Sequence, residues 1–318
     1  MKYTIKTILL SALLLGFVSG CVKEDLSKCN PGVLLKFDYS LNPESTNLFG
    51  EEVDKVTVYV FDEKGLYYGC FSEAGKRLTN GWEMLLPLPP GNYTTVTWAG
   101  PLGTFRIGET NADGTAFQNE LKKGVTHIDD FMLTAEQDGR PLTALDNLYH
   151  GIAQVTSTYQ PEMVTTVDLM KNTKHLIVTV LDASVAGSGK DAPYEVYCTG
   201  ANARYMADNR IGKQAETVTY RPFETFTNLG EAVSELNVLR LVMGRPIRLV
   251  VKSKDGKTVF DKDLLEVLMS TGHYNAQEDF DREDTYRVVI EMGQSGGGEG
   301  GITITVNGWL AVEIIPDL

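Results

Sequence analysis

The sequence has few of the residues that usually carry catalysis or bind metal ions. Its four histidines, His127, His150, His175 and His273, are isolated from one another, and no HExxH zinc motif occurs. Its four cysteines form no CxxC pair, so neither a zinc site nor a redox dithiol is indicated. We therefore expect a protein that is not an enzyme and that holds no metal and no cofactor.

The sequence is also poor in basic residues and in long apolar runs. Lysine and arginine number 29 against 42 aspartates and glutamates, which gives a formal net charge of −13. Nucleic-acid binding needs stripes of positive charge, so no nucleic-acid partner is expected. Only residues 8–18 form a nearly unbroken apolar run, and a membrane-spanning helix needs about 20 such residues.

That apolar run has the form of a signal peptide. Lys2 and Lys6 precede it, and it ends in Val18-Ser19-Gly20-Cys21. Small residues followed by a cysteine are similar to a bacterial lipobox, where the cysteine accepts a diacylglycerol. We expect cleavage before Cys21 and acyl chains such as palmitate that hold the protein in the outer membrane. An ordinary signal peptide with a chance cysteine is the alternative.

The residues after Cys21 carry a second signal. Lys23-Glu24-Asp25 is similar to the export tag of surface lipoproteins of the Bacteroidota, which predicts a position on the cell surface. The alternative is a solvated, charged tether with no export role.

Three cysteines remain once Cys21 is lipidated. An exported protein meets an oxidising environment, where a disulfide can form. Cys29 and Cys70 lie in the same half of the chain, so we predict that they pair and that Cys198 is a buried thiol.

Short β-strands separated by turn residues dominate the mature chain. Residues 33–39 alternate, with apolar side chains on one face, and strands at 56–61, 66–71 and 93–99 follow. A second series runs from residue 167 to residue 306, and only residues 263–270 show a helical pattern. This spacing predicts an all-β protein made of antiparallel sandwiches.

The length of the chain suits about two domains. We expect a signal peptide at 1–20 and a lipidated tether at 21–32. An N-terminal β-sandwich domain would span 33–165 and a C-terminal β-sandwich domain 166–318.

Three patterns match functional sites only formally. The glycines at 296, 298 and 301 fit GxGxxG, but a strand rather than a helix follows them. Residues 109–120 are close to a calcium loop with Glu109 at its first position, and a polar turn is the better interpretation. Asp129-Asp130 and Glu283-Asp284 are adjacent acids, which face opposite ways on a strand, so we expect solvated loop positions.

The order of several short motifs resembles a known family. These motifs span nearly the whole mature chain: Cys21 with Asp25-Leu26-Ser27-Lys28-Cys29 and Pro31, the strand through Phe37 and Tyr39, Val58-Tyr59-Val60-Phe61-Asp62 with Gly65, Leu88-Pro89-Pro90-Gly91-Asn92-Tyr93 with Trp98, Leu148-Tyr149-His150-Gly151, the strand at 169–180, Arg282-Glu283-Asp284-Thr285-Tyr286, and Trp309. Together with the lipobox, they resemble the FimB-type fimbrial anchor lipoproteins, minor fimbrillins of the type V pili of Bacteroidota.

This resemblance implies two transthyretin-like antiparallel β-sandwich domains in tandem. It also implies a minor subunit that binds pilus structural subunits, anchors the fibre to the outer membrane and limits its length. Stalk subunits of such pili lose their first strand to an arginine-specific protease. Here no arginine occurs between Cys21 and Arg77, so the first strand has no upstream site and should stay in place.

The C-terminal strand is a candidate for donation to another subunit. Ile302, Ile304 and Val306 present one apolar face beyond the glycine-rich residues 293–301. A strand of this kind can complete the open edge of another sheet. The alternative is that it pairs within its own sheet.

Two other functions remain open on the sequence. A surface glycan-binding lipoprotein would use exposed aromatics, for which Tyr67, Tyr68 and Trp82 are candidates. A lipoprotein hydrolase would need a catalytic set assembled by the fold, and no sequence signature marks one.

Overall fold

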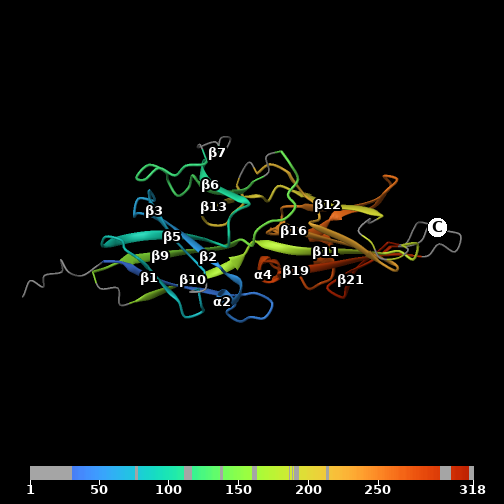
Figure 1. Cartoon of the computed structure of the whole chain (residues 1–318), viewed down its shortest axis with the longest axis horizontal. Helices are drawn as coiled ribbons and strands as arrows, with labels where there is room; N and C mark the ends of the chain where they lie inside the picture. The colour runs from blue at the N-terminus through green and yellow to red at the C-terminus, as the bar shows by residue number, and fades with distance from the viewer. Residues whose placement is uncertain are drawn as a thin grey trace, which may run out of the picture.

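The computed structural model describes residues 31–75, 78–110, 117–136, 139–159, 163–185, 187, 189, 193–212, 215–293 and 302–314. The molecule is elongated, with the N-terminal half at the left and the C-terminal half at the right of Figure 1. Nearly all regular structure is β-strand, so the predicted all-β class is confirmed. No helix in these ranges is long and apolar enough to cross a membrane.

One seven-stranded sheet forms most of the N-terminal half. Its strands lie in the order β3-β2-β5-β9-β10-β1-β4. Their bounds are β1 (Val33–Leu41), β2 (Lys55–Phe61), β3 (Tyr67–Ala74), β4 (Glu83–Leu86), β5 (Gly91–Ala99), β9 (Tyr149–Ser157) and β10 (Val164–Lys171), and the short helix α2 (Phe49–Glu52) follows β1.

This sheet folds back on itself to make a sandwich. β9 and β10 pair only at Met170↔His150 and Lys171↔Tyr149, so the sheet bends there into two layers. The layer β4-β1-β10 packs on the layer β3-β2-β5-β9 through alternate residues. One apolar cluster accordingly joins Phe37 of β1 with Val58 of β2.

A third layer covers the other face of β2 and β5. It is a four-stranded sheet in the order β13-β8-β6-β7. Tyr59 and Phe61 of β2 pack against Phe131 of this layer, with ring centroids 5.0 and 5.4 Å apart. The bounds are β6 (Phe105–Thr110), β7 (Phe117–Gln118), β8 (Phe131–Ala135) and β13 (Arg204–Met206).

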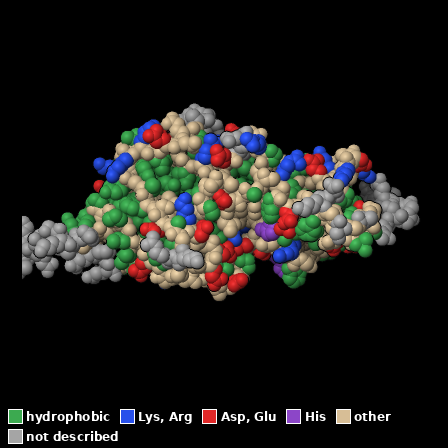
Figure 2. Space-filling view, in the orientation of Figure 1, with side chains coloured by type: hydrophobic (Ala, Val, Ile, Leu, Met, Phe, Trp, Pro, Cys, Tyr) green, Lys and Arg blue, Asp and Glu red, His purple; other side chains and the backbone are tan. Residues whose placement is uncertain are grey.

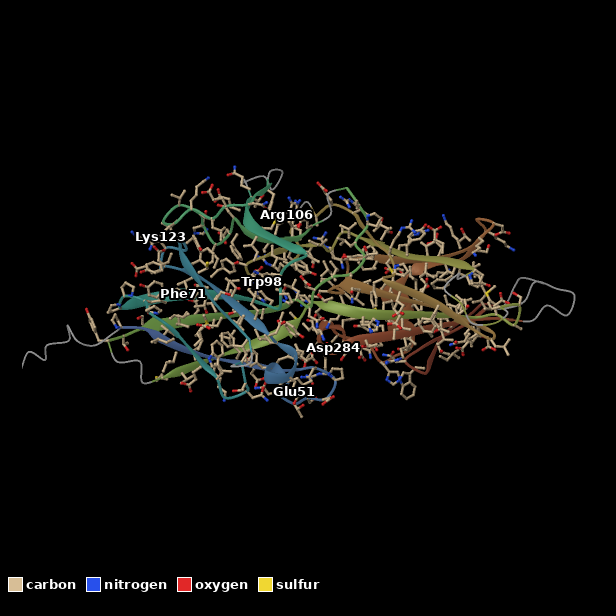
Figure 3. All side chains as sticks on the ribbon, in the orientation of Figure 1. Glu51, Phe71, Trp98, Arg106, Lys123 and Asp284 are labelled. Atoms are coloured by element: carbon tan, nitrogen blue, oxygen red, sulfur yellow. The ribbon has the colours of Figure 1, made fainter. Side chains whose placement is uncertain are left out.

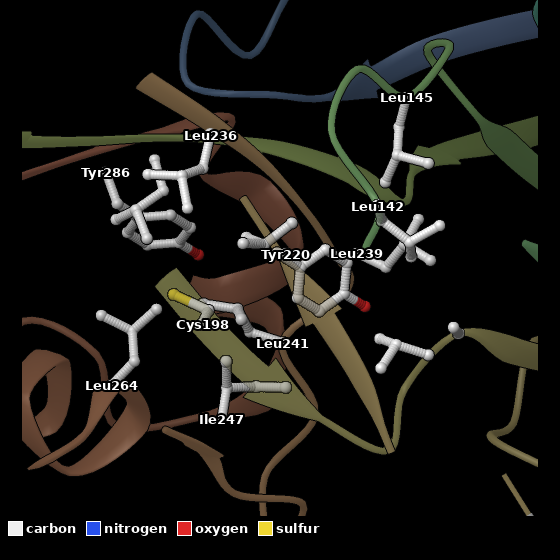
Figure 4. Packing of buried hydrophobic residues seen from close by; sticks show 14 of the residues in the cluster. Leu142, Leu145, Cys198, Tyr220, Leu236, Leu239, Leu241, Ile247, Leu264 and Tyr286 are labelled. Carbon is white, nitrogen blue, oxygen red and sulfur yellow. The ribbon is translucent and has the colours of Figure 1, made fainter. Parts of the chain in front are cut away.

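The C-terminal half is a second sandwich. A six-stranded sheet, β15-β16-β11-β19-β20-β21, faces a four-stranded sheet, β14-β12-β17-β18. Figure 4 shows Cys198, Tyr220, Leu236 and Tyr286 packed between them. The bounds are β11 (Thr173–Leu181), β12 (Tyr194–Gly200), β14 (Val218–Tyr220), β15 (Glu224–Asn228), β16 (Glu231–Leu239), β17 (Ile247–Ser253), β18 (Thr258–Asp263), α3 (Leu264–Ser270), α4 (Gln277–Arg282), β19 (Thr285–Met292), β20 (Ile302–Val306) and β21 (Trp309–Ile314).

The two halves meet at Asn172. β10 ends at Lys171 in the N-terminal sheet, and β11 begins at Thr173 in the C-terminal sheet. The boundary expected near residue 165 therefore lies inside β10. The halves are also not strictly consecutive, because β13 comes from the second half of the chain yet pairs with β8.

Candidate functional site

The first strand is an interior strand of the N-terminal sandwich. β1 pairs in parallel with β10 on one side and antiparallel with β4 on the other. Its inward side chains Val33, Leu35, Phe37 and Tyr39 are at most 3% exposed. The Phe37 ring stacks on those of Phe49 and Trp82, at 5.5 and 5.9 Å between centroids. With β1 in place, the groove that its removal would open is filled.

The end of β1 is joined to the C-terminal half. The Tyr39 hydroxyl donates to both carboxylate oxygens of Asp284, at 2.9 and 2.7 Å. Burial, together with the Asp284 carboxylate, raises the pKa of Tyr39 far above its usual value, so the hydroxyl stays protonated. Figure 3 shows Asp284 between the two halves.

Two lysines flank this contact. The Lys171 ammonium lies 2.8 Å from the Glu52 carboxylate and 3.7 Å from that of Asp284. Lys174 is fully buried, and its ammonium donates to the Asp281 carbonyl at 2.7 Å and lies 3.8 Å from Asp284. Burial lowers the pKa of Lys174 to about 8, against the opposing effect of Asp284 and Asp281.

Asp281 completes the set from α4. Its carboxylate accepts two hydrogen bonds from the Arg240 guanidinium, both 2.7 Å, and one from Gln277 at 3.0 Å. We call Tyr39, Glu52, Lys171, Lys174, Arg240, Asp281 and Asp284 the junction network. Three carboxylates face three cations in it, so its charges compensate one another, which suits a rigid joint rather than a reactive site.

Neutral contacts reinforce the joint. The buried amides of Asn172 and Asn209 donate to each other, at 2.6 and 3.0 Å. The His150 ring lies on Trp98, and its Nε2 is 2.8 Å from the Ala207 carbonyl. Burial lowers the pKa of His150 to about 4, so the ring is neutral near pH 7 and its Nε2–H donates to that carbonyl.

The sequence had not pointed to Asp284 as a central residue. The acidic pair Glu283-Asp284 was expected in a solvated loop, and this was wrong for Asp284, whose side chain is only 16% exposed. No local pattern reveals its role, because its partner Tyr39 lies 245 positions away in the chain.

The predicted cysteine sites are only partly within the described residues. Cys21 and Cys29 lie outside them, so the lipidation and the Cys29–Cys70 pair stay predictions. Cys70 is exposed on β3, directly opposite Tyr59 of β2. Cys198 is fully buried, and its burial raises the pKa of the thiol.

The C-terminal strand candidate lies inside a sheet. β20 pairs with β19 on one side and with β21 on the other. Ile304 and Val306 are fully buried in the core, and Ile302 packs at its margin. In this structure the strand thus pairs within its own sheet, and donation would require it to leave β19.

The other sequence candidates do not converge on one site. Tyr67 packs against Phe61, while Tyr68 packs against Tyr93 with the Lys123 ammonium 4.1 Å from its ring centroid. Trp82 stacks on Phe37, so these aromatics form no common flat platform. The Glu109 carboxylate is held by Thr126 and Lys122. The described residues contain no cluster of potential metal ligands.

Comparison with known proteins identifies the family. A family model described as fimbrillin-A associated anchor proteins Mfa1 and Mfa2 matches residues 26–314. The chain belongs to this fimbrial anchor family. The predicted resemblance is therefore confirmed.

Individual proteins that are similar to this chain are consistent with this family assignment. The chain is 24% identical to the minor fimbrium anchoring subunit Mfa2 of Porphyromonas gingivalis, over 93% of this chain and 90% of that protein. The solved structure of a P. gingivalis fimbrial anchor protein Mfa2 has a TM-score of 0.67 at 22% identity, covering 88% and 98% of the two chains. A Bacteroides thetaiotaomicron structure, described as a candidate polysaccharide-binding protein, has a TM-score of 0.75 at 26% identity, covering 88% and 96%.

Proposed function

We propose that this protein is a non-enzymatic lipoprotein that anchors a fimbrium to the outer membrane and binds fimbrial structural subunits. Membership of the anchor family supports the fimbrial role. The lipobox-like Val18-Ser19-Gly20-Cys21 supports the lipid anchor, and the Lys23-Glu24-Asp25 tag supports display on the cell surface.

One structural observation carries the anchor role. β1 is paired on both sides, is buried on its inner face and is tied through Tyr39 to the C-terminal half. No arginine lies between Cys21 and this strand. A chain that keeps both its lipid and its first strand stays attached at its N-terminus, which suits the base of a fibre.

The experiment that tests the lipid anchor is metabolic labelling with an alkyne fatty acid. We expect the wild-type protein to carry label and to fractionate with the outer membrane after an alkaline wash. Cys21→Ala should carry none, and Cys198→Ala is the matched control that keeps the label. Label on Cys21→Ala would reject Cys21 as the lipid site.

We propose separately that the C-terminal strand is donated to the next subunit. Ile302, Ile304 and Val306 give β20 the alternating apolar face that a donor strand needs. Ile290 of β19 lies opposite Ile304 of β20 and would be exposed if β20 left the sheet. Donation of β20 to the next subunit must therefore provide contacts that replace those lost with β19.

Polysaccharide binding, the property given to the Bacteroides thetaiotaomicron relative, is not our proposal for this chain. Tyr67, Tyr68 and Trp82 pack against other rings of the fold instead of sharing one exposed face. A glycan pulldown with purified protein separates the two functions, and specific retention of the protein would favour the glycan role.

A further inference from the structure

A hollow lies along one side of the N-terminal sandwich, between the edge strands of its two layers. It has a volume of about 530 Å³. One wall is formed by residues 70–73 of β3, and the other by Trp82 and the first three residues of β4, 83–85. The layer β4-β1-β10 has one strand fewer than the layer β3-β2-β5-β9. The inner side chains of β3, Tyr68 and Phe71, are correspondingly only partly covered. We call this hollow the β3–β4 groove.

The groove runs between two outer strand edges, that of β3 and that of β4. Among the described residues, no strand pairs with the outer edge of β4 or with that of β3 beyond Tyr67. A free edge presents backbone N–H and C=O groups that an added strand can pair with. Figure 2 shows hydrophobic side chains gathered on the surface of the N-terminal half in this view.

Several other sheet edges of the molecule are covered. Thr227 of β15 exchanges backbone hydrogen bonds with Gly189. Leu142 forms a parallel β-bridge with Tyr220 of β14. On β21, the Ser270 hydroxyl donates to the Ala311 carbonyl at 2.8 Å. These contacts block strand addition at their edges, whereas the described residues leave the β3–β4 groove without such a cover.

The opposite side of the same sandwich is closed. Gly151 of β9 lies so close to β10 that a Cβ atom there would come within 2.8 Å of the Asp168 carbonyl oxygen and 2.6 Å of the Val167 side chain. There is no space for a strand between β9 and β10 at this point. Within the described residues, the open side of this sandwich is therefore the one between β3 and β4.

The lining of the groove selects the chemistry of an occupant. Its apolar side chains are those of Phe71, Trp82, Met84 and Leu85, and Leu85 is 49% exposed. Among the described residues that line it, the charged ones are Glu83, which is exposed, and Glu73, which already has an interaction partner. Alternating apolar and basic residues on an extended strand match this surface, because successive side chains point to opposite faces.

We propose that the β3–β4 groove binds an extended peptide segment of a fimbrial subunit by strand addition to β4. Apolar side chains of the segment contact Phe71 and Trp82, and a basic side chain lies beside Glu83. The site is distinct from the position of β1 and from the C-terminal strand. The identity of the partner rests on the proposed fimbrial function, whereas the strand-binding groove does not.

The direct test uses the purified mature chain with Cys21→Ala and a six-residue peptide of alternating lysine and valine. Binding is followed by fluorescence of Trp82, with Trp82→Phe showing which part of the signal comes from this residue. We expect saturable binding that weakens at least tenfold when the central valine of the peptide is replaced by proline, which removes a backbone donor.

Two charge-reversal variants, one inside the groove and one outside it, locate the site. Glu83→Lys should weaken peptide binding at least tenfold, while Glu44→Lys, an exposed position outside the groove, makes the same change in net charge and should leave binding unchanged. Absence of saturable binding, equal binding of the proline peptide, or equal loss in both variants would overturn the proposal. Binding only after deletion of residues 22–30 would also overturn it, because the chain's own tether would then be the occupant.

The partner is tested on cells with a photoreactive amino acid at Leu85. The control position is Ile152, an aliphatic strand residue of similar exposure, 43%, in the same half. We expect an adduct with an extended segment of a fimbrial subunit from position 85 only. Peptide binding without such an adduct would reject the fimbrial partner while keeping the groove, and an adduct without peptide binding would reject strand addition.

Discussion

The Tyr39 hydroxyl and the Asp284 carboxylate join the first strand to the loop before β19 across 245 positions of sequence, at 2.7 Å. Tyr39 lies in the strand that follows the predicted lipid tether, while Asp284 lies beside the sheet that holds the C-terminal strand. Lys171 and Lys174 surround the same carboxylate. Force applied to the C-terminal half would thus reach the anchored end through a compact set of polar contacts rather than through a flexible linker.

Removing the Tyr39 hydroxyl should weaken this joint. Tyr39→Phe keeps the ring that packs on Tyr149 but removes a hydrogen bond to a charged group, a loss of about 1.5–3 kcal/mol. We expect the free energy of unfolding in urea to fall by that amount. Tyr159→Phe is the control, because Tyr159 is exposed. An unchanged unfolding free energy for Tyr39→Phe would show that the contact adds nothing.

Acid should destabilise the protein through His150. Its folded pKa of about 4 lies below its ordinary value of 6.5, so the unfolded chain binds the extra proton first. The contribution of neutral His150 to the free energy of unfolding is fully present above about pH 6.5. It falls as the pH drops towards 4 and changes no further at lower pH. From the size of the shift, about 3 kcal/mol should be lost over that range.

The matched variant is His150→Phe, which keeps a ring beside Trp98 but cannot titrate. It should flatten the fall in unfolding free energy between pH 6.5 and 4, although it loses the hydrogen bond to Ala207 at every pH. Thermal unfolding across this pH series measures both proteins. If stability fell equally with pH in the wild-type and His150→Phe proteins, His150 would not be the group that causes the loss of stability in acid.

The cysteine assignment is tested by counting thiols. If Cys29 and Cys70 pair and Cys21 carries lipid, thiol labelling of the protein, denatured without reductant, should modify one cysteine, Cys198. Labelling should require denaturation, since Cys198 is fully buried. Three modified cysteines would reject the disulfide.

An engineered disulfide between β19 and β20, which reductant can open again, tests donation of the C-terminal strand. Val289 and Thr305 lie directly opposite on β19 and β20, and both are partly exposed, so cysteines there can bond without entering the core. If β20 is donated, the oxidised Val289→Cys/Thr305→Cys protein should lose capture of fimbrial subunits, and reductant should restore it. Val289→Cys alone is the control. Equal capture by the oxidised double variant would remove β20 from assembly.

Local patterns in the sequence predicted individual elements well. The alternation at residues 33–39 corresponds to β1, and the helical pattern at 263–270 to α3, whose first turn is capped by the Asp263 side chain. These features depend on neighbours in the chain, so the sequence displays them directly. The short helix α4 was missed, because its six residues are too few to show a clear period.

Long-range features could not be predicted in this way. The parallel pairing of β1 with β10 and the entry of β13 into the N-terminal half depend on partners more than 60 residues apart. The boundary expected near residue 165 lies inside β10, because that strand runs from Val164 to Lys171. Asp284 was misjudged because only the fold brings Tyr39 to it.

Retention of whole fimbriae on cells tests the account most directly. Cells producing Cys21→Ala should release fimbriae into the medium, while wild-type cells keep them on the surface, as measured by quantifying a fimbrial structural subunit in both fractions. The Cys21→Ala protein should be exported and folded, with its unfolding transition unchanged. Fimbriae that stay cell-bound at the wild-type level in this variant would contradict the proposal that this protein anchors them through lipid on Cys21.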